Sequence, residues 1–251
     1  MRPPNPGTST NDLFGVAVLS SSNAWAVGDD SNGAAFHTLI EHWNGTSWKQ
    51  VPSPNPGKGS NYLSSVTAVS ATSIWAVGSY ASKAGGFAPD KTFILRWNGT
   101  AWKQVPSPSP GSSLDQLNGV RAVSATSAWA VGDYAGSNFQ DKTLILRWTG
   151  TAWKQVPSPS PGTQSSVLIG VDAVPASTNA WAVGAATAIS TGPAFELHWN
   201  GSKWTNMVSP NPGDTSKMFA VAASSASNAW AVGEFTPDPS GTEHRTLAFH
   251  C

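Results

Sequence analysis

Aromatic and charged residues gather in two loops of this chain, at residues 79–91 and 133–142. Each loop combines aromatic side chains with an acidic and a basic residue, which suits the binding of a small polar ligand or a peptide. The alternative is that the acidic and basic residues at 90–91 and 141–142 only cap the strand that follows each loop. The candidate ligand-binding residues are Tyr80, Phe87, Asp90, Lys91, Tyr134, Phe139, Asp141 and Lys142.

Two further candidates, Arg121 and Asp172, carry opposite charges at equivalent positions of successive sequence repeats. The same position holds Ala17, Thr67 and Ala222 in the other repeats. Charges near the axis of a repeat protein are costly unless they are paired. We therefore expect the two side chains to approach each other, either as a structural ion pair or as part of a ligand site.

The chain shows no residue pattern typical of catalysis. A sialidase-type enzyme needs a cluster of arginines, a tyrosine nucleophile and acidic partners, and here only Arg121 and Arg245 are placed to converge. Most other polar residues recur in register, as Arg96 does with Arg147, and this favours structural roles. No His, Asp and Glu set has metal-ligand spacing. We expect no catalytic residue, no metal and no cofactor.

Composition excludes several classes of partner. The 251 residues carry 14 basic and 14 acidic side chains, so the net charge is zero. Nucleic-acid binding and attachment to an anionic membrane both need a basic surface, so neither is expected. No apolar run approaches the ~20 residues of a membrane span, and no signal peptide is visible. The single cysteine, Cys251, rules out an intrachain disulfide. The neutral surface leans toward an extracellular or cell-surface location, but the compartment stays unknown.

These residues are positioned by a repeat of about 50 residues. The motif Trp-Ala-Val-Gly recurs at 25–28, 75–78, 129–132, 181–184 and 230–233, and Trp-x-Gly-x-x-Trp follows it four times. Each of the first four repeats contains four short β-type segments and an Asn-Gly or related hairpin signal, and it ends in a proline-rich exit. This period without a helical pattern predicts an all-β chain, a single β-propeller domain of about five four-stranded antiparallel blades. The expected blades are 8–57, 58–111, 112–162, 163–213 and 214–251.

The order of these segments resembles known propeller repeats. A hydrophobic strand ending in Gly28, a variable loop, a strand ending in Trp43 and a proline-rich exit together resemble the kelch repeat. The Asn44–Trp48 turn is also similar to that of bacterial Asp-box (BNR-type) propellers, although it lacks their Asp and second Gly. Both resemblances imply a propeller. The kelch resemblance implies that the variable loops emerge on one face and bind a protein or a glycan.

The fifth repeat stops early. Cys251 stands where the other repeats have Trp43, Trp97, Trp148 and Trp199, and no fourth strand follows it. We predict a three-stranded fifth blade whose edge strand is left frayed or contacts another chain. The first residues repeat the proline-rich phrase that ends other repeats, so the chain is also compatible with a piece of a longer array.

Three functions agree with these observations. The first is a non-catalytic scaffold that binds a protein or glycan through the variable loops. The second is an assembly unit that associates with itself through the incomplete fifth blade. The third is a degenerate sialidase-like propeller. Binding assays, mass in solution and turnover of a sialoside, respectively, would distinguish them.

Overall fold

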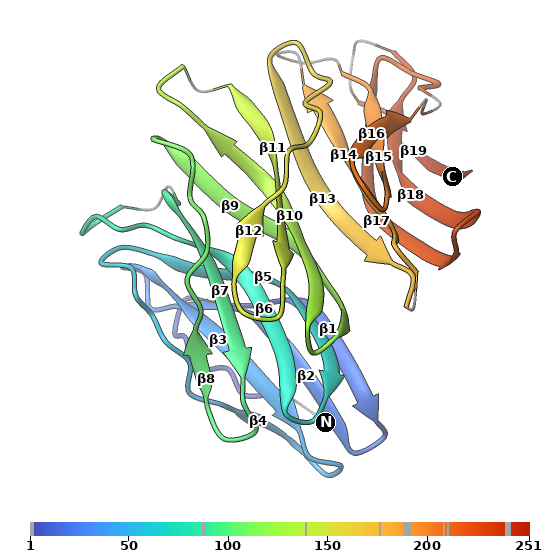
Figure 1. The fold of residues 1–251 in the computed structure, drawn as a ribbon. Helices are drawn as coiled ribbons and strands as arrows, with labels where there is room; N and C mark the ends of the chain where they lie inside the picture. The colour runs from blue at the N-terminus through green and yellow to red at the C-terminus, as the bar shows by residue number, and fades with distance from the viewer. Residues whose placement is uncertain are drawn as a thin grey trace.

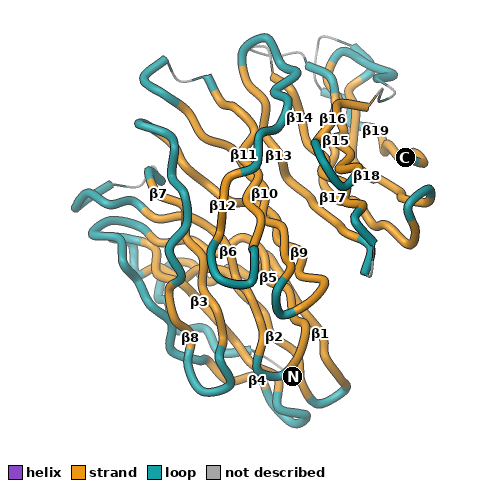
Figure 2. Tube along the Cα trace, in the orientation of Figure 1, coloured by secondary structure: helices purple, strands orange, loops and turns teal. Residues whose placement is uncertain are grey.

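The computed structural model describes residues 3–86, 89–138, 140–175, 177–187, 192–207, 209, 211–238 and 242–251. In these residues every regular element is a strand, drawn orange in Figure 2. The strands form five antiparallel sheets in chain order, four with four strands and one with three.

Each sheet forms one blade, numbered 1 to 5. Within a blade, neighbours in sequence pair as antiparallel neighbours in space. The strands of blades 1 and 2 are β1 (Thr10–Ser20), β2 (Asn23–Ser31), β3 (Phe36–Trp43), β4 (Trp48–Gln50), β5 (Asn61–Ser70), β6 (Ser73–Tyr80), β7 (Lys91–Trp97) and β8 (Trp102–Gln104). Those of blades 3 to 5 are β9 (Leu114–Ser124), β10 (Ser127–Ala135), β11 (Asp141–Trp148), β12 (Trp153–Gln155), β13 (Ser165–Ala173), β14 (Asn179–Thr187), β15 (Ala194–Asn200), β16 (Trp204–Met207), β17 (Thr215–Ser225), β18 (Asn228–Thr236) and β19 (Arg245–His250).

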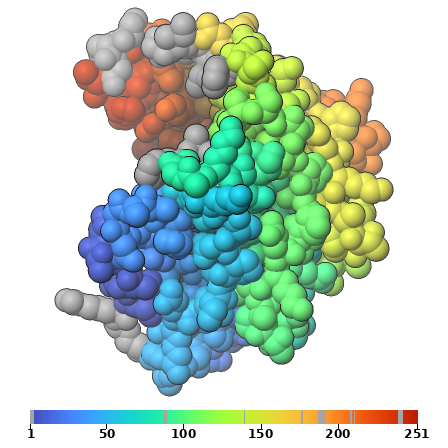
Figure 3. Space-filling model, turned by 90° about the vertical axis from the view of Figure 1, so that its left-hand side faces the viewer, coloured from blue at the N-terminus to red at the C-terminus, as the bar shows by residue number. Residues whose placement is uncertain are grey.

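The blades follow one another along an open arc (Figure 1). The first strands β1, β5, β9, β13 and β17 contact one another in turn and form its inner side. Blade 1 (blue) and blade 5 (red) lie at opposite ends, with blades 2 and 3 between them (Figure 3). The predicted all-β, propeller-like architecture is therefore confirmed, and so is the three-stranded fifth blade.

Every blade has a β-bulge beside the repeated glycine. Next to this glycine, one residue of each first strand has no partner on the second strand. A Cβ on Gly132 would overlap the carbonyl oxygen of Gln116, and the other four glycines meet the same obstacle. Glycine is needed there because the two backbones approach closely. The five bulged residues are Phe14, Ser64, Asn118, Ile169 and Phe219.

The bulge corrects one sequence-based prediction. The repeated glycine, Gly28 in blade 1, was expected to end the second strand. Instead β2 continues to Ser31 and β1 begins at Thr10. A bulge adds one residue without ending the ladder, so pairing resumes beyond Gly28. Residues 10–13 are therefore paired in register with residues 28–31 on the sheet.

Tryptophans fill the space between blades, as their repetition predicted. Trp75 is fully buried and lies against Trp148 and Trp153 of the next blade, with ring centroids 4.9 and 5.2 Å away. The hairpin glycines, among them Gly45 at φ 93°, adopt the positive φ expected from the Asn-Gly signal.

The proline-rich exits are tied to the third strands. Thr92 Oγ1 lies 2.7 Å from Ser107 Oγ, and the same pair recurs in blades 1 and 3. This contact returns each proline-rich segment to the end of the blade where the next first strand begins.

Candidate functional site

A cavity of about 590 Å³ opens on the face of the arc where the first strands of the blades begin. Blades 1, 2 and 3 all contribute to it, and we call it the funnel. Its lining combines carboxylates, aromatic rings and small polar groups. The lining residues are Asp12, Phe14, Asp29, Phe36, Tyr62, Leu63, Ser64, Ser79, Pro89 and Gln116.

Two carboxylates meet in the blade 1 wall of the funnel. Asp12 on β1 and Asp29 on β2 are direct cross-strand partners. Asp29 is only 3% exposed, whereas Asp12 faces solvent. Burial, followed by the nearby charges of Asp12 and Asp30, raises the pKa of Asp29 to about 6. The wall therefore carries concentrated negative charge, part of it shielded from water.

Aromatic rings form the adjoining walls. Phe36 at the start of β3 lies 5.3 Å from Tyr62 on β5, centroid to centroid. Phe14 is the bulged residue of β1 and is 60% exposed. Bulges re-aim a side chain relative to the strand, and here the bulged ring lines the cavity.

Blade 3 shows how this chain satisfies a carboxylate at the position of Asp29. Asp133 is fully buried on β10 and accepts hydrogen bonds from Gln116 Nε2 at 3.0 Å and Asn118 Nδ2 at 3.1 Å. Asn118 also donates to the carbonyl of Leu168 in blade 4. Burial still raises the pKa of Asp133 to about 7, although these hydrogen bonds lower it. Asp29 has no such donors among the described residues.

The residues predicted from the variable loops lie in other places. Tyr80 pairs with Lys91, and Tyr134 pairs with Lys142, across neighbouring strands. Each pair lines a separate groove against the proline-rich exit of its own blade, of about 440 and 570 Å³ respectively. The structure therefore does not bring the two loops into one site. Phe87 and Phe139 lie outside the described residues.

The two predicted loop aspartates differ in their surroundings. Asp90 accepts hydrogen bonds from the Ser82 amide at 2.7 Å and the Ser82 hydroxyl at 2.6 Å. Burial alone would raise the pKa of Asp90, but the Ser82 hydrogen bonds and the charge of Lys91 outweigh it and hold the pKa below its ordinary value. The Asp90 carboxylate therefore fastens residue 82 of the loop close to the start of β7. Asp141 begins β11, and its amide donates to Ser165 of blade 4.

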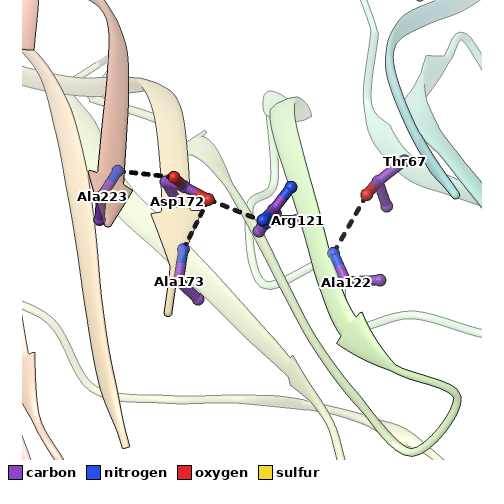
Figure 4. A network of polar contacts seen from close by, with 6 residues as sticks. All are labelled: Thr67, Arg121, Ala122, Asp172, Ala173 and Ala223. Atoms are coloured by element: carbon purple, nitrogen blue, oxygen red, sulfur yellow. Dashed lines mark hydrogen bonds and ion pairs between the residues drawn. The ribbon is translucent and has the colours of Figure 1, made fainter. Parts of the chain in front are cut away.

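Arg121 and Asp172 approach each other as predicted, with Arg121 Nε 2.8 Å from Asp172 Oδ1 (Figure 4). Asp172 also accepts hydrogen bonds from the amides of Ala173 and Ala223, at 2.8 and 2.7 Å. One carboxylate therefore links blades 3, 4 and 5 along the inner strands. The pair lies toward the far ends of β9 and β13, away from the funnel.

Sequence reasoning missed Asp12, Asp29 and the rings around them. Asp29 was assigned to a loop, and no pattern marked Asp12 as its partner. The described residues contain no group of three or more His, Cys, Asp and Glu side chains arranged to hold a metal ion. In the same part of the chain, no helix has the length and apolar character to cross a membrane.

Comparisons with known proteins identify the fold and no sequence family. No family model and no curated protein matches the sequence. A protein of unknown function from Dyadobacter fermentans DSM 18053 matches with a TM-score of 0.62 and 14% identity, over 97% of this chain and 76% of that chain.

Two further solved structures match less well. YCF48 bound to D1 peptide has a TM-score of 0.49 and 14% identity, over 93% of this chain and 66% of that chain. A gluconolactonase from Xanthomonas campestris has a TM-score of 0.49 and 12% identity, over 95% of this chain and 72% of that chain. This chain thus spans about two thirds of the YCF48 chain. At these identities the likeness shows a propeller-type fold alone.

Proposed function

We propose that this protein is a non-catalytic binding scaffold that captures a segment of a polypeptide in the funnel. The observation that carries the proposal is the funnel itself, where two carboxylates and three aromatic rings converge from neighbouring blades. Apolar walls with a few polar groups are typical of ligand sites. The uncompensated negative charge favours a polypeptide over a neutral glycan as the ligand.

A binding screen with defined probes tests this function. Immobilised peptide and glycan arrays are incubated with the purified chain and with the Asp12→Asn/Asp29→Asn double variant. We expect a set of peptides that the wild type binds and the double variant does not. Asp30→Asn is the matched control, because Asp30 is the next residue of β2 and lines a different cavity with His37. Binding to glycans alone, or peptide binding that ignores the double variant, would contradict the proposal.

The non-catalytic character is part of the same proposal. The degenerate sialidase-like alternative predicts turnover of a sialoside at the funnel. A fluorogenic sialoside assay separates the two, since hydrolysis that is lost in the double variant would favour the enzyme.

A second candidate function, self-assembly, is supported by the tryptophans between blades. At three junctions a Trp-Ala-Val-Gly tryptophan lies against both tryptophans of the next blade's Trp-x-Gly-x-x-Trp motif. Its ring is 4.8 to 5.2 Å from the first and 5.2 to 5.4 Å from the second. The two receiving rings lie 5.8 to 5.9 Å apart with interplanar angles of 48 to 51°.

Blade 1 carries the same receiving pair at an outer end of the arc. Trp43 and Trp48 lie 5.9 Å apart at 49°, as the pairs inside the arc do. On β1 of the same blade, Val16 and Val18 are 65% and 70% exposed. At the other end Trp230 of blade 5 is 52% exposed. The two ends therefore carry the two halves of the junction that is repeated inside the arc.

We infer that a second copy of the 251-residue chain places Trp230 against Trp43 and Trp48 of the first. The contact is head to tail and joins blade faces, unlike the strand-edge contact expected from the incomplete fifth blade. Light scattering over a concentration series should show association that Trp230→Ala abolishes. Phe14→Ala is the control, because Phe14 is also more than half exposed but lines the funnel. A monomer at all concentrations, or association unaffected by Trp230→Ala, would overturn this candidate.

A further inference from the structure

The pair of positions that holds Asp12 and Asp29 recurs in every blade with different chemistry. Blade 3 has an amide facing a carboxylate, blade 5 has opposite charges, and blades 2 and 4 have no charge there. Only blade 1 of the five described blades has like charges. The cross-strand pairs are Asp12–Asp29, Tyr62–Ser79, Gln116–Asp133, Val167–Ala185 and Lys217–Glu234. Like charges directly opposite each other on a sheet are destabilising, so the fold itself gives no reason for the blade 1 pair.

The buried member of the pair lacks a partner. Asp29 is 97% buried by residue area and lines the funnel. No hydrogen bond or ion pair links its carboxylate to any residue in the described part of the chain. Buried carboxylates are normally satisfied by donors or by a positive charge, as Asp133 is by Gln116 and Asn118. The missing donor is therefore one that a ligand can supply.

The rings around the pair favour an organic cation. Phe14, Phe36 and Tyr62 line the same cavity as the two carboxylates. Cations bind favourably over aromatic faces, and a guanidinium can also bind a carboxylate through two parallel hydrogen bonds. The chain uses this chemistry elsewhere: the Arg96 guanidinium lies 4.9 Å from the Trp75 ring centroid, and that of Arg147 lies 5.1 Å from that of Trp129.

We propose that the funnel binds a positively charged side chain, in the first place arginine, presented by a polypeptide partner. The guanidinium pairs with Asp29 and Asp12 and lies against the Phe36 and Tyr62 rings. This inference rests on the proposed binding function and specifies the chemistry of its ligand. Calcium is a weaker candidate, because it takes six to eight oxygen ligands and this wall offers two carboxylates.

A pair of isosteric peptides tests the inference. Acetyl-Gly-Arg-Gly-amide and acetyl-Gly-citrulline-Gly-amide have nearly the same shape, but the citrulline side chain is neutral. Each is titrated into the ¹⁵N-labelled chain, and amide shifts of residues 12, 29, 36 and 62 report binding. We expect the arginine peptide to bind at these residues and the citrulline peptide to bind about tenfold or more weakly, because it loses a charge-assisted hydrogen bond.

Variants place the effect at the two carboxylates. Asp29→Asn should weaken the arginine peptide about tenfold or more, and Asp30→Asn should leave its affinity within about twofold. Asp12→Asn changes an exposed residue and keeps the test valid if Asp29→Asn fails to fold. The inference is overturned by equal binding of both peptides, by amide shifts outside the funnel, or by calcium shifting these amides when the arginine peptide does not.

The two proposals can fail separately. If the array screen finds ligands that depend on the funnel but contain no arginine or lysine, the binding function stands and the cation inference is wrong. If no ligand depends on the funnel, both are wrong.

Discussion

Asp133 should make the stability of this protein fall as the pH rises. Its side chain is fully buried, and its pKa is raised from 3.8 to about 7 by burial and, to a smaller extent, by the charges of Asp141 and Asp115. Between these two values the native state holds a proton that the unfolded chain has lost. The free energy of unfolding therefore decreases with pH across this window and levels off above pH 7.

The size of the effect follows from the shift. A difference of about three pKa units corresponds to about 4 kcal/mol. Asn at position 133 can accept the same hydrogen bonds from Gln116 and Asn118 but has no charge to bury. We expect Asp133→Asn to match the wild type below pH 4 and to be more stable by up to about 4 kcal/mol above pH 7.

Urea unfolding followed by tryptophan fluorescence, at half-unit steps from pH 4 to pH 8, measures this difference. Asp214→Asn is the control, since Asp214 is exposed, and its profile should run parallel to that of the wild type. Asp29 and Asp115, both with pKa values raised to about 6, add slopes of the same sign to every profile. If the Asp133→Asn profile also runs parallel to the wild type, the reasoning from burial is wrong.

Three further changes test the architecture. Gly132→Ala should destabilise the fold by roughly 2 kcal/mol or more in urea unfolding, because its Cβ would overlap backbone, whereas Gly136→Ala meets only a side-chain oxygen at 3.5 Å and should be nearly neutral. Asp172→Ala should lower the unfolding free energy by roughly 2–3 kcal/mol, more than Arg121→Gln does. The reason is that it leaves the Arg121 guanidinium and the amides of Ala173 and Ala223 without their acceptor. An equal loss in the two variants would contradict this. Thr92→Val removes the contact with Ser107, so it should lower the unfolding free energy by about 1 kcal/mol and speed proteolysis of the proline-rich segment at 105–111. Unchanged cleavage would show that this contact does not hold the segment in place.

Much of the fold could be predicted from the repeated residues because their roles are local. The Asn-Gly signal at Asn44 and Gly45 needs only its own backbone conformation to set the hairpin. The approach of Arg121 and Asp172 followed from their equivalent positions in adjacent blades.

The funnel could not be predicted because it depends on register. The Gly28 position was interpreted as the end of a strand, so Asp29 fell in a presumed loop. In the structure the bulge at Phe14 lets the ladder continue, and this places Asp12 opposite Asp29. A glycine that permits a bulge and a glycine that ends a strand look alike in one sequence. Residues that follow a glycine of the second kind lie in a loop, whereas here they lie on a strand that lines the funnel.

The arc divides stability and binding between its blades. The inner strands of blades 2 to 5 are linked by polar side chains, as Thr67 accepts from the amide of Ala122 and Asp172 from that of Ala223 (Figure 4). Blade 1 has Ala17 at that position, and alanine can offer no such acceptor. The funnel thus lies where blade 1 meets blade 2 without this link, and where a buried carboxylate lacks a donor. A ligand bound in the funnel would supply the donor that Asp29 lacks at this junction.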